Sequence, residues 1–322
     1  MDLAAIEQGC DARPKPVNQS TRFGSGQARG SLTIQHGWLC LGLKSPYDVG
    51  MEALIFWLES VTDLQRVVWL LGALSIAWLL EACLPLFEFG YRKVQHVLRN
   101  LVFVLTTGLV TLVLAFVVYG VMAIGHNDRG LLMLLELPVW LEMICALAIL
   151  DFFGQYFVHV CLHRYKWLWK LHLVHHSDTE VDASTGTRHH PGDMLFREMV
   201  IFAVIVTLGI APHWYLLYRV ITPFFAYFTH ANIALPDGLD RALVWVIVTP
   251  NMHKFHHHLE RPWTNTNYGN VLSIWDRLFG TFVYESVSQV RYGVDTVDGN
   301  YSDDLIYQFK LPFNSTIKTD QS

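Results

Sequence analysis

Two long apolar runs, nearly free of charged residues, constrain the fold of this chain more than any other feature. They cover residues 67–87 and 101–124, and about 20 apolar residues are enough to cross a bilayer as a helix. Charged residues make up 16% of the chain, whereas soluble domains carry roughly 25%. A helix satisfies its backbone hydrogen bonds within one segment, as lipid requires. We therefore predict an integral membrane helical bundle, not a large soluble core.

Two further apolar segments are interrupted by polar residues or prolines. Residues 131–158 form a third candidate span that includes three acidic residues, and residues 199–228 form a fourth apolar zone broken by Pro212 and Pro223. A proline inside a helix removes a backbone hydrogen bond and bends the helix. The fourth zone could be a bent span or a hairpin that re-enters from one side. We expect about four spanning or re-entrant segments, within residues 51–150 and in this later zone.

The two ends of the chain are polar. Residues 1–50 are rich in Gly, Ser, Gln and Arg and contain no apolar core of a secretory signal, so we predict a disordered N-terminal extension. The stretch that begins at Met51 also resembles a natural start of the chain. Residues 291–322 are predicted to be a polar C-terminal tail.

Histidines gather in one part of the sequence. Thirteen of the sixteen lie between His159 and His258, and three groups have regular spacing: HxxxH at 159–163 and HxxHH at 172–176 and 253–257. Residues three and four apart share a helix face, so each group can point its rings into one cavity. Neutral imidazole is the commonest protein ligand of transition metals. Eight such rings exceed the four ligands of one tetrahedral zinc ion, which favours two metal ions.

The remaining histidines carry weaker signals. His258 points away from the face that its neighbours share, and of the adjacent pair before Pro191 we favour His190 over His189 as a ligand. Four isolated histidines are interpreted as ordinary hydrogen-bonded side chains: His36, His96, His126 and His213.

Metal-bound rings need their second nitrogen held by a carboxylate or carbonyl. Asp151 lies eight residues before His159, about two helical turns away on the same face, and an acid in an apolar span requires a partner. We therefore expect Asp151 beside the ligands. Asp276 is a second candidate, although an ordinary surface pair between Asp276 and Arg277 explains it equally well.

The basic residues predict the orientation of the spans. Three of them, Arg92, Lys93 and Arg99, lie between the first two apolar runs, whereas the next loop has Arg129 beside Asp128. The positive-inside rule places the first of these loops in the cytoplasm. The third span then returns to the cytoplasm at His159, next to a second basic group formed by Arg164, Lys166 and Lys170. The histidines are thus expected to face the cytoplasm.

At these residues the chain resembles the fatty acid hydroxylase/sterol desaturase superfamily of membrane-bound di-iron enzymes. The resemblance covers residues 151–282, close to half of the chain. The motifs that carry it, in family order, are His159-Val-Cys-Leu-His163, His172-Leu-Val-His175-His176, Thr229-His230-Ala-Asn232, His253-Lys-Phe-His256-His257, Asn267-Tyr-Gly and Trp275-Asp276-Arg-Leu-Phe-Gly. Together these motifs are highly specific.

The resemblance implies an all-α membrane bundle with a cytosolic helical cap that holds a dinuclear site, and a catalytic domain over residues 151–290. The cofactors implied are two iron ions, for which zinc can substitute in purified protein, with O2 as co-substrate. The family often has a further histidine where this chain has Ala234, and Asn232 is the nearest polar residue expected beside the ligands. The implied ligands are His159, His163, His172, His175, His176, His230, His253, His256 and His257.

Hydroxylation of a fatty acyl, sterol or related lipid is the reaction that we expect. Sterol or lipid desaturation and ether-lipid oxygenation are the alternatives within the family. The chain has no dinucleotide-binding GxGxxG motif, no cysteine set for an iron–sulfur cluster and no haem domain. A separate electron donor is therefore expected, either a ferredoxin or a cytochrome b5-type protein with its reductase.

Other classes of function fit the sequence less well. A metal transporter would place ligands in the middle of several spans, whereas residues 67–87 contain only Glu81 and residues 101–124 contain no acidic residue or histidine. A zinc hydrolase would show about three ligands and an HExxH motif. The net charge of −5, without a run of Lys and Arg, gives no reason to expect a nucleic-acid partner.

Overall fold

The computed structural model describes residues 46–123 and 130–317, and within these ranges the chain is helical. The only β pairings among the described residues are two isolated bridges, Pro85–Ile233 and Ile247–Leu272. The predicted all-α class is confirmed. Most of the predicted N-terminal extension, together with His36 and His126, lies outside the described residues.

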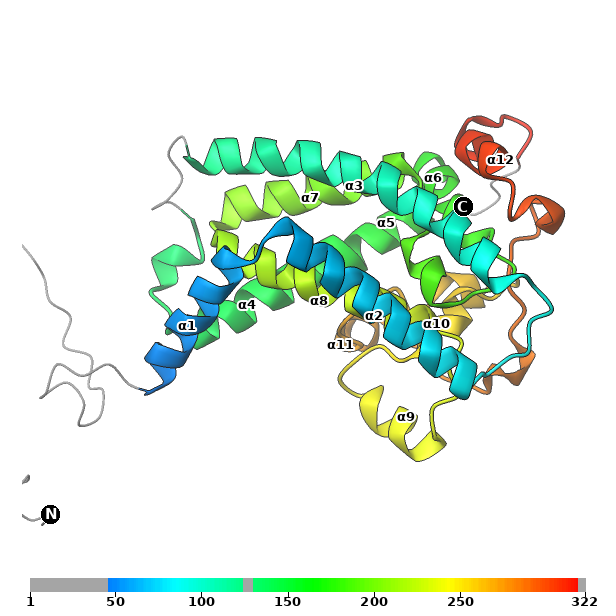
Figure 1. Ribbon diagram of the computed structural model, residues 1–322, viewed down its shortest axis with the longest axis horizontal. Coiled ribbons are helices and arrows are strands. Elements are labelled where there is room, and N and C mark those ends of the chain that lie inside the picture. Colours follow the sequence, from blue (N-terminus) through cyan, green and yellow to red (C-terminus); the bar gives the residue numbers. More distant parts are fainter. Residues whose placement is uncertain (1–45, 124–129, 318–322) are drawn as a thin grey trace, which may run out of the picture. The chain divides into compact units, whose positions relative to one another are not determined.

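The α-helices (Figure 1) are α1 (Pro46–Ser60), α2 (Asp63–Cys83), α3 (Lys93–Ala123), α4 (Val139–Asp151), α5 (Val158–Arg164), α6 (Lys166–His176), α7 (Pro191–Leu208), α8 (Pro212–His230), α9 (Asp237–Leu243), α10 (Pro250–His256), α11 (Ile274–Leu278) and α12 (Leu305–Lys310).

Shorter helical turns connect these elements. Six are 3₁₀ turns, and one is a π-helix, η5, which joins α4 to α5 without a break. The short elements are η4 (Met133–Leu135), η5 (Phe152–Phe157), η6 (Ala183–Thr187), η7 (Trp263–Asn265), η8 (Val287–Gln289), η9 (Gly299–Tyr301) and η10 (Leu311–Phe313).

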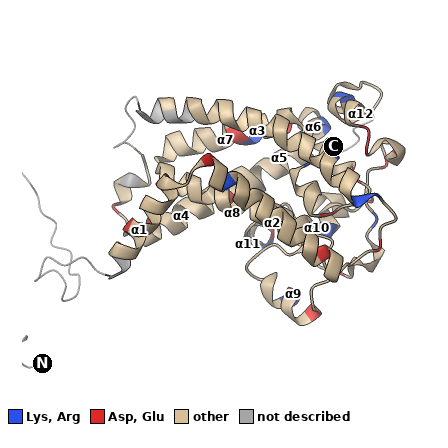
Figure 2. Cartoon of the chain, in the orientation of Figure 1, with Lys and Arg blue, Asp and Glu red and all other residues tan. Residues whose placement is uncertain are grey.

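Three helical stretches of the described chain are long and apolar enough to cross a membrane. They are α2, residues 93–117 of α3, and the continuous stretch 139–164 through α4, η5 and α5. Large apolar side chains such as Leu105 and Phe116 are about three-quarters exposed, a pattern that water does not tolerate over a whole helix. Figure 2 shows few charged residues along α2, α3 and α4. These spans agree with the three predicted from the sequence, and the chain is a membrane protein.

The fourth apolar zone is a helical hairpin. Gly209, with a φ of +66°, ends α7 in the left-handed conformation, and α8 begins at Pro212, where the missing backbone donor is tolerated. A Cβ on Gly209 would lie 2.4 Å from the Cα of Gly130, so only glycine permits this close approach. α7 packs on α3, and α8 packs on α2 and α4 (Figure 1). Pro223 lies inside α8 without ending it.

The C-terminal segment is packed against the helices and is not a loose polar tail within the described residues. Leu311 is buried, and it lies in one apolar cluster with Phe103 of α3 and Trp169 of α6. Lys170 donates from Nζ to the carbonyl of Asn314 over 3.1 Å. The segment therefore covers the outer side of α6, the helix that carries three of the predicted ligands.

Candidate metal centre

Nine buried histidines converge in two neighbouring clusters. In each cluster one ring nitrogen of every member lies within 4.8 Å of the others. The first cluster, which we call site A, contains five rings, and the second, site B, contains four. Site A is formed by His159, His163, His172, His176 and His256, and site B by His175, His230, His253 and His257.

Each HxxHH segment serves both sites. In α6 the outer pair, His172 and His176, belongs to site A, while His175 between them belongs to site B. In the segment 253–257, at α10, the assignment is reversed, because His256 belongs to site A and the outer pair to site B. The sequence predicted one cavity for each run. Since both helices divide their rings in this way, the two sites must lie side by side.

The spacing of the ring nitrogens fits metal coordination. The Nε2 atoms of His159 and His172 are 2.9 Å apart, and those of His253 and His230 are 3.1 Å apart. Two imidazole nitrogens bound at right angles to one ion, each at about 2.1 Å, would be about 3.0 Å apart. Within the described residues, Nε2 of His256 and both ring nitrogens of His257 are buried without a hydrogen-bond partner. A metal ion would satisfy these otherwise costly buried atoms, so the residues fit the metal that the sequence implied.

Burial keeps the imidazoles in the neutral form that binds metal. It lowers the pKa of His175, His176, His253 and His257 well below the ordinary value of 6.5, and the neighbouring rings lower it further. Burial likewise lowers the pKa of His172 to about 4, although the carboxylate of Asp193 opposes this shift. The site thus requires no proton release from these rings at neutral pH.

Backbone carbonyls and one carboxylate hold the second ring nitrogen of some of the ligands, whereas Nδ1 of His175, His253 and His257 has no partner among the described residues. Nδ1 of His159 contacts the carbonyl of Tyr268 at 2.8 Å, and Nδ1 of His256 contacts that of Thr266 at 2.7 Å. Nδ1 of His172 lies 2.6 Å from Oδ2 of Asp193, which is fully buried. Such contacts fix the ring orientation and leave Nε2 free for a metal. Asp193 was not among the predicted residues. The sequence signal that could have indicated it is an acidic residue four positions after His189, in the first turn of α7.

Asp151 does not play the predicted role. Its Oδ2 accepts hydrogen bonds from Nε1 of Trp275 and from the backbone of Leu272, while His159 uses the carbonyl of Tyr268 instead. The prediction assumed a regular α-helix between residues 151 and 159. The π-helix η5 lies between them, and its wider turns shift the helical phase. Asp151 therefore holds the loop after residue 270.

Asp276 supports the site through the backbone. It is buried and accepts hydrogen bonds from the backbone amides of Tyr268 and Gly269 at 2.8 and 2.9 Å. It thereby holds the loop whose Tyr268 carbonyl contacts His159. The alternative of a surface pair with Arg277 is wrong, because the Arg277 guanidinium lies over the rings of Trp245 and Phe282.

Asn232 also acts at a distance from the rings. Its side-chain amide exchanges two hydrogen bonds with the backbone of Phe87, at 3.0 and 2.7 Å. It therefore ties the chain after α2 to the end of α8, and the prediction that it lies beside the ligands is not met.

Of the two adjacent histidines before α7, His190 was predicted to lie at the metal centre, but His189 is the one that lies there. His190 caps α7, since its Nδ1 accepts from the amide of Gly192, and its ring lies near Phe309 and Phe313. Its neighbour His189 stacks on the site B ring of His175, with ring centroids 4.6 Å apart. The rigid φ of Pro191 fixes the turn into the helix, and the ring before it becomes the cap.

Two neighbouring cavities, which share part of their lining, lie beside the histidine rings. The inner one, of about 40 Å³, is bordered by rings of both sites, including His172 and His230. The outer one, of about 220 Å³, reaches α2 at Leu70 and α3 at Val104. The residues that border both are Gln155, Gly186, His189, Arg197, Ala226 and Asn270.

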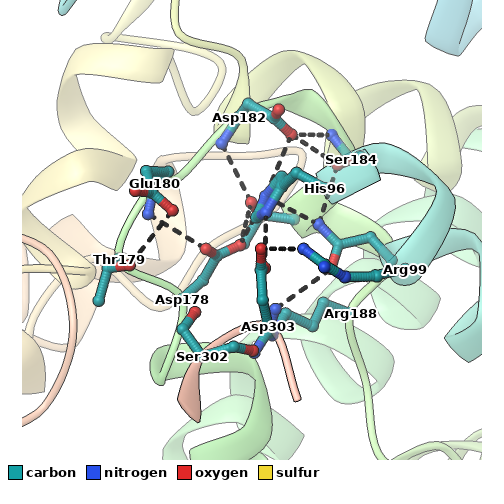
Figure 3. A network of polar contacts seen from close by, with 12 residues as sticks. His96, Arg99, Asp178, Thr179, Glu180, Asp182, Ser184, Arg188, Ser302 and Asp303 are labelled. Carbon is teal, nitrogen blue, oxygen red and sulfur yellow. Dashed lines mark hydrogen bonds and ion pairs between the residues drawn. The ribbon is translucent and has the colours of Figure 1, made fainter. Parts of the chain in front are cut away.

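A buried polar network fixes the chain that follows α6 (Figure 3). His96 of α3 lies 3.3 Å from Oδ2 of Asp178 and 3.2 Å from Oδ1 of Asp303. Arg188 donates to the carbonyls of Val174 and Ser302. The network joins α3, the segment after His176 and the C-terminal segment. His96 is thus the hydrogen-bonded side chain expected from the sequence. The His213 ring lies near a carboxylate, with its Nδ1 3.6 Å from Oε1 of Glu59.

Comparison with known proteins agrees with this geometry. Residues 143–281 match the family model described as fatty acid hydroxylase. The similarity to fatty acid hydroxylases covers 139 of the 322 residues. The matched region contains most of the third candidate span and all nine clustered histidines. No solved structure matches the chain.

Several proteins with a sequence similar to this region have names of lipid-modifying enzymes. An ornithine lipid hydroxylase of Rhizobium tropici is 32% identical over 145 residues, which is 45% of this chain and 43% of that protein. The human alkylglycerol monooxygenase is 30% identical over 142 residues, 44% of this chain and 31% of that protein. A cholesterol 25-hydroxylase-like protein of Danio rerio is 28% identical, over 46% of this chain and 57% of that protein. The chain therefore spans less than half of the first two relatives.

Proposed function

We propose that this protein is a membrane-bound di-iron oxygenase that hydroxylates a lipid. The observation that carries the proposal is the pair of adjacent histidine clusters, bordered by a cavity that reaches the candidate membrane spans. The hydroxylases and monooxygenases among the relatives favour hydroxylation over desaturation. The overall reaction inserts one atom of O2 into a C–H bond and releases the other as water, with two electrons and two protons supplied from outside.

The nine clustered histidines are the proposed ligands, five for one ion in site A and four for the other in site B. Imidazole nitrogen suits iron, copper, nickel and zinc, and iron is proposed because only a redox-active metal can activate O2 for attack on a C–H bond. Site B has one ring fewer than site A. The inner cavity borders rings of both sites, so a substrate carbon there can approach the two sites together.

The residues around the two sites orient the histidine rings and exclude bulk water. Asp193 and the carbonyls of Tyr268 and Thr266 hold rings in a fixed orientation, which preserves the geometry through a catalytic cycle. All nine rings are buried. Burial keeps bulk water away from a reactive centre and so prevents side reactions.

A lipid could reach the site without leaving the bilayer. The outer cavity is lined by Leu70 of α2 and by residues of α3 between Val104 and Thr111, and both helices are candidate spans. We infer that the substrate enters sideways between these helices and that its reacting carbon reaches the inner cavity.

The proposed orientation places the histidine sites on the cytoplasmic side. The basic residues at the start of α3 and around α6 support it through the positive-inside rule. The two electrons would then come from a cytoplasmic ferredoxin or a cytochrome b5-type protein with its reductase.

The test of the proposed function is lipid analysis by mass spectrometry. Membranes from cells that contain the wild-type chain should hold a lipid that is heavier by one oxygen atom than its precursor, and ¹⁸O2 should label it. Cells that contain the His163→Ala variant at equal abundance are the control and should lack the product. A loss of two hydrogens without added oxygen would indicate a desaturase, and equal lipids in both strains would contradict the proposal.

A further inference from the structure

The outer cavity has an unusual wall for a passage that takes lipids. Besides apolar side chains it contains three charged residues, Arg197 and Glu198 of α7 and Arg219 of α8. Each is inside a helix and faces neighbouring helices. A buried charge is costly unless it is paired or meets a charged ligand, so the partners of these three groups decide what the cavity can bind.

Glu198 and Arg219 are partners of each other. Their closest atoms, Oε1 and Nη1, are 2.6 Å apart. Glu198 also accepts from the hydroxyls of Tyr215 at 3.2 Å and Thr111 at 3.3 Å. Three donors from two helices, α3 and α8, satisfy this carboxylate of α7, so the pair is a structural connection between the three helices.

Arg197 has donors left over. It is 8% exposed, and within the described part of the chain its hydrogen bonding is a single contact, from Nε to Oδ1 of Asp193 at 2.8 Å. A guanidinium has five N–H donors. The carboxylate of Asp193 is itself shared, because its Oδ2 contacts His172 and His189. The two terminal NH₂ groups of Arg197 therefore have no acceptor among the residues that the structure describes.

The position of Arg197 is at the junction of the two cavities. It is the only charged residue among those that border both. The other polar residues at the junction include Gln155 and Asn270, whose amide NH₂ groups donate to Tyr218 and Thr222 at 2.9 and 3.3 Å. A ligand group at this junction would meet the free side of one guanidinium, beside the histidine rings.

The charge balance around the junction also favours an anion. All nine proposed ligands are imidazoles, which bring no negative charge to a metal, so metal ions bound there would keep their full positive charge. The charge of Arg197 adds to that potential, and Asp193 balances only part of it. An anionic group next to Arg197 would be attracted by the guanidinium and by the metal ions together.

We infer that Arg197 binds an oxyanion of the substrate, a carboxylate or a phosphate, at the entrance to the metal centre. The class of substrate is then an anionic or zwitterionic lipid that presents its polar end to the metal ions. The outer cavity, about 220 Å³, is smaller than the roughly 300–1,000 Å³ of pockets that enclose a whole drug-sized ligand. It therefore takes the end of a lipid, while the tail stays between α2 and α3. The inference that the bound lipid is a substrate rests on the proposed function. The binding of an anionic lipid at Arg197 can be measured without turnover.

Lipid binding by the purified, metal-loaded chain in an uncharged maltoside detergent tests the inference. The dissociation constants of matched lipids are measured by native mass spectrometry at pH 8, with no electron donor present. Oleate is compared with oleyl alcohol, and dioleoyl phosphatidic acid with dioleoylglycerol, so that the two arms separate a carboxylate from a phosphate. One or both anions should bind about 10-fold to 100-fold more tightly than the neutral partner, the range of a charge-assisted hydrogen bond.

The variant Arg197→Gln removes the charge but keeps an N–H donor for Asp193. Its preference for the anion should fall to about 2-fold or less while its metal content stays at the wild-type value. The matched control is Arg291→Met, which removes an exposed arginine paired with Glu260 and should leave the preference unchanged. Equal binding of anionic and neutral lipids by the wild-type chain would overturn the inference, whether or not Arg197→Gln folds. An unchanged preference in folded Arg197→Gln would overturn it too.

These outcomes are independent of the proposed hydroxylation. If the chain prefers the anionic lipid but yields no oxygenated lipid, the result supports the binding site at Arg197 and contradicts the proposed hydroxylation. If the chain hydroxylates a neutral lipid and shows no preference for the anion, the result supports the proposed function and contradicts the binding site.

Discussion

At the scale of the residue, the assignment of each ring to a site depends on its position in the HxxHH segment. His256 is informative because its Nδ1 is fixed by the carbonyl of Thr266 while its Nε2 is buried without a partner. The next-but-one residue, His258, has both ring nitrogens engaged outside the sites, by the carbonyl of Gln289 and the amide of Glu260. Two similar buried histidines thus have different chemistry available to them.

We predict that His256→Ala removes metal from site A and abolishes turnover, while the chain still inserts into the membrane. The neighbouring change His258→Ala should leave both metal content and turnover near wild type, because this ring lies outside the two clusters. Metal analysis of the purified variants, together with lipid product formation, checks this pair. A His256→Ala protein with full metal content and full activity would remove that residue from the proposed ligands.

A second prediction at this scale concerns the carboxylate that holds His172. Asp193→Asn should weaken metal binding by about 10-fold to 100-fold, as removal of an orienting partner of a ligand usually does. Competition with a chelator measures the affinity. Asp295→Asn changes an exposed carboxylate and is the control. Affinities that are equal in the two variants would show that Asp193 has no orienting role.

At the scale of the element, two departures from regular α-helix shape the site. The π-helix η5 rotates His159 away from the face of Asp151, and the short turn η6 packs closely on α8. At Gly186 in η6, an added Cβ would lie 2.5 Å from the carbonyl oxygen of Ala226 and 3.3 Å from Nδ1 of His230. This glycine permits the backbone of η6 to approach a site B ligand.

We predict that Gly186→Ala destabilises the protein by about 1–3 kcal/mol, the usual cost of overpacking, and lowers the metal occupancy of site B. The control is Gly72→Ala in α2, where an added Cβ meets nothing within 4 Å and alanine favours the helix. Thermal unfolding and metal content of both variants in detergent give the answer. Wild-type stability of Gly186→Ala would mean that η6 can move away from α8 without cost.

At the scale of the whole molecule, the two sites are assembled from helices far apart in the sequence. Site A combines α5, α6 and α10, and site B combines α6, α8 and α10 with the residue that follows α10. The C-terminal segment and the network around Asp178 hold the outer side of α6. Stability and metal binding are therefore properties of the assembled bundle, and they should respond to pH together.

We predict that the metal-free protein becomes less stable as the pH falls below 6.5. Burial lowers the pKa of the clustered imidazoles in α6 and in the segment 253–257 below the ordinary value of 6.5, to about 4 for His172. Between these values the unfolded chain binds more protons than the folded chain, so stability rises with pH and is lost on acidification. The midpoint of thermal unfolding should fall by at least about 5 °C from pH 7 to pH 5.

Thermal scans of the chelator-treated protein measure this dependence, and bound metal should steepen it because protons compete for the same nitrogens. A midpoint that is constant or rises over this pH range would show that the buried rings do not dominate the acid response.

Sequence alone determined the all-α class, three of the membrane spans and eight of the nine clustered histidines, because hydrophobic length and helical spacing are local properties. The ninth, His230, has no such spacing and was implied by the family resemblance. Only the tertiary structure decided how the rings divide between sites A and B, since that depends on which helices meet. It also exchanged the positions predicted for His189 and His190, replaced Asp151 by backbone carbonyls, and revealed Asp193 and Arg197. These contacts join segments whose separation and phase, including a π-helix, follow from packing and not from spacing along the chain.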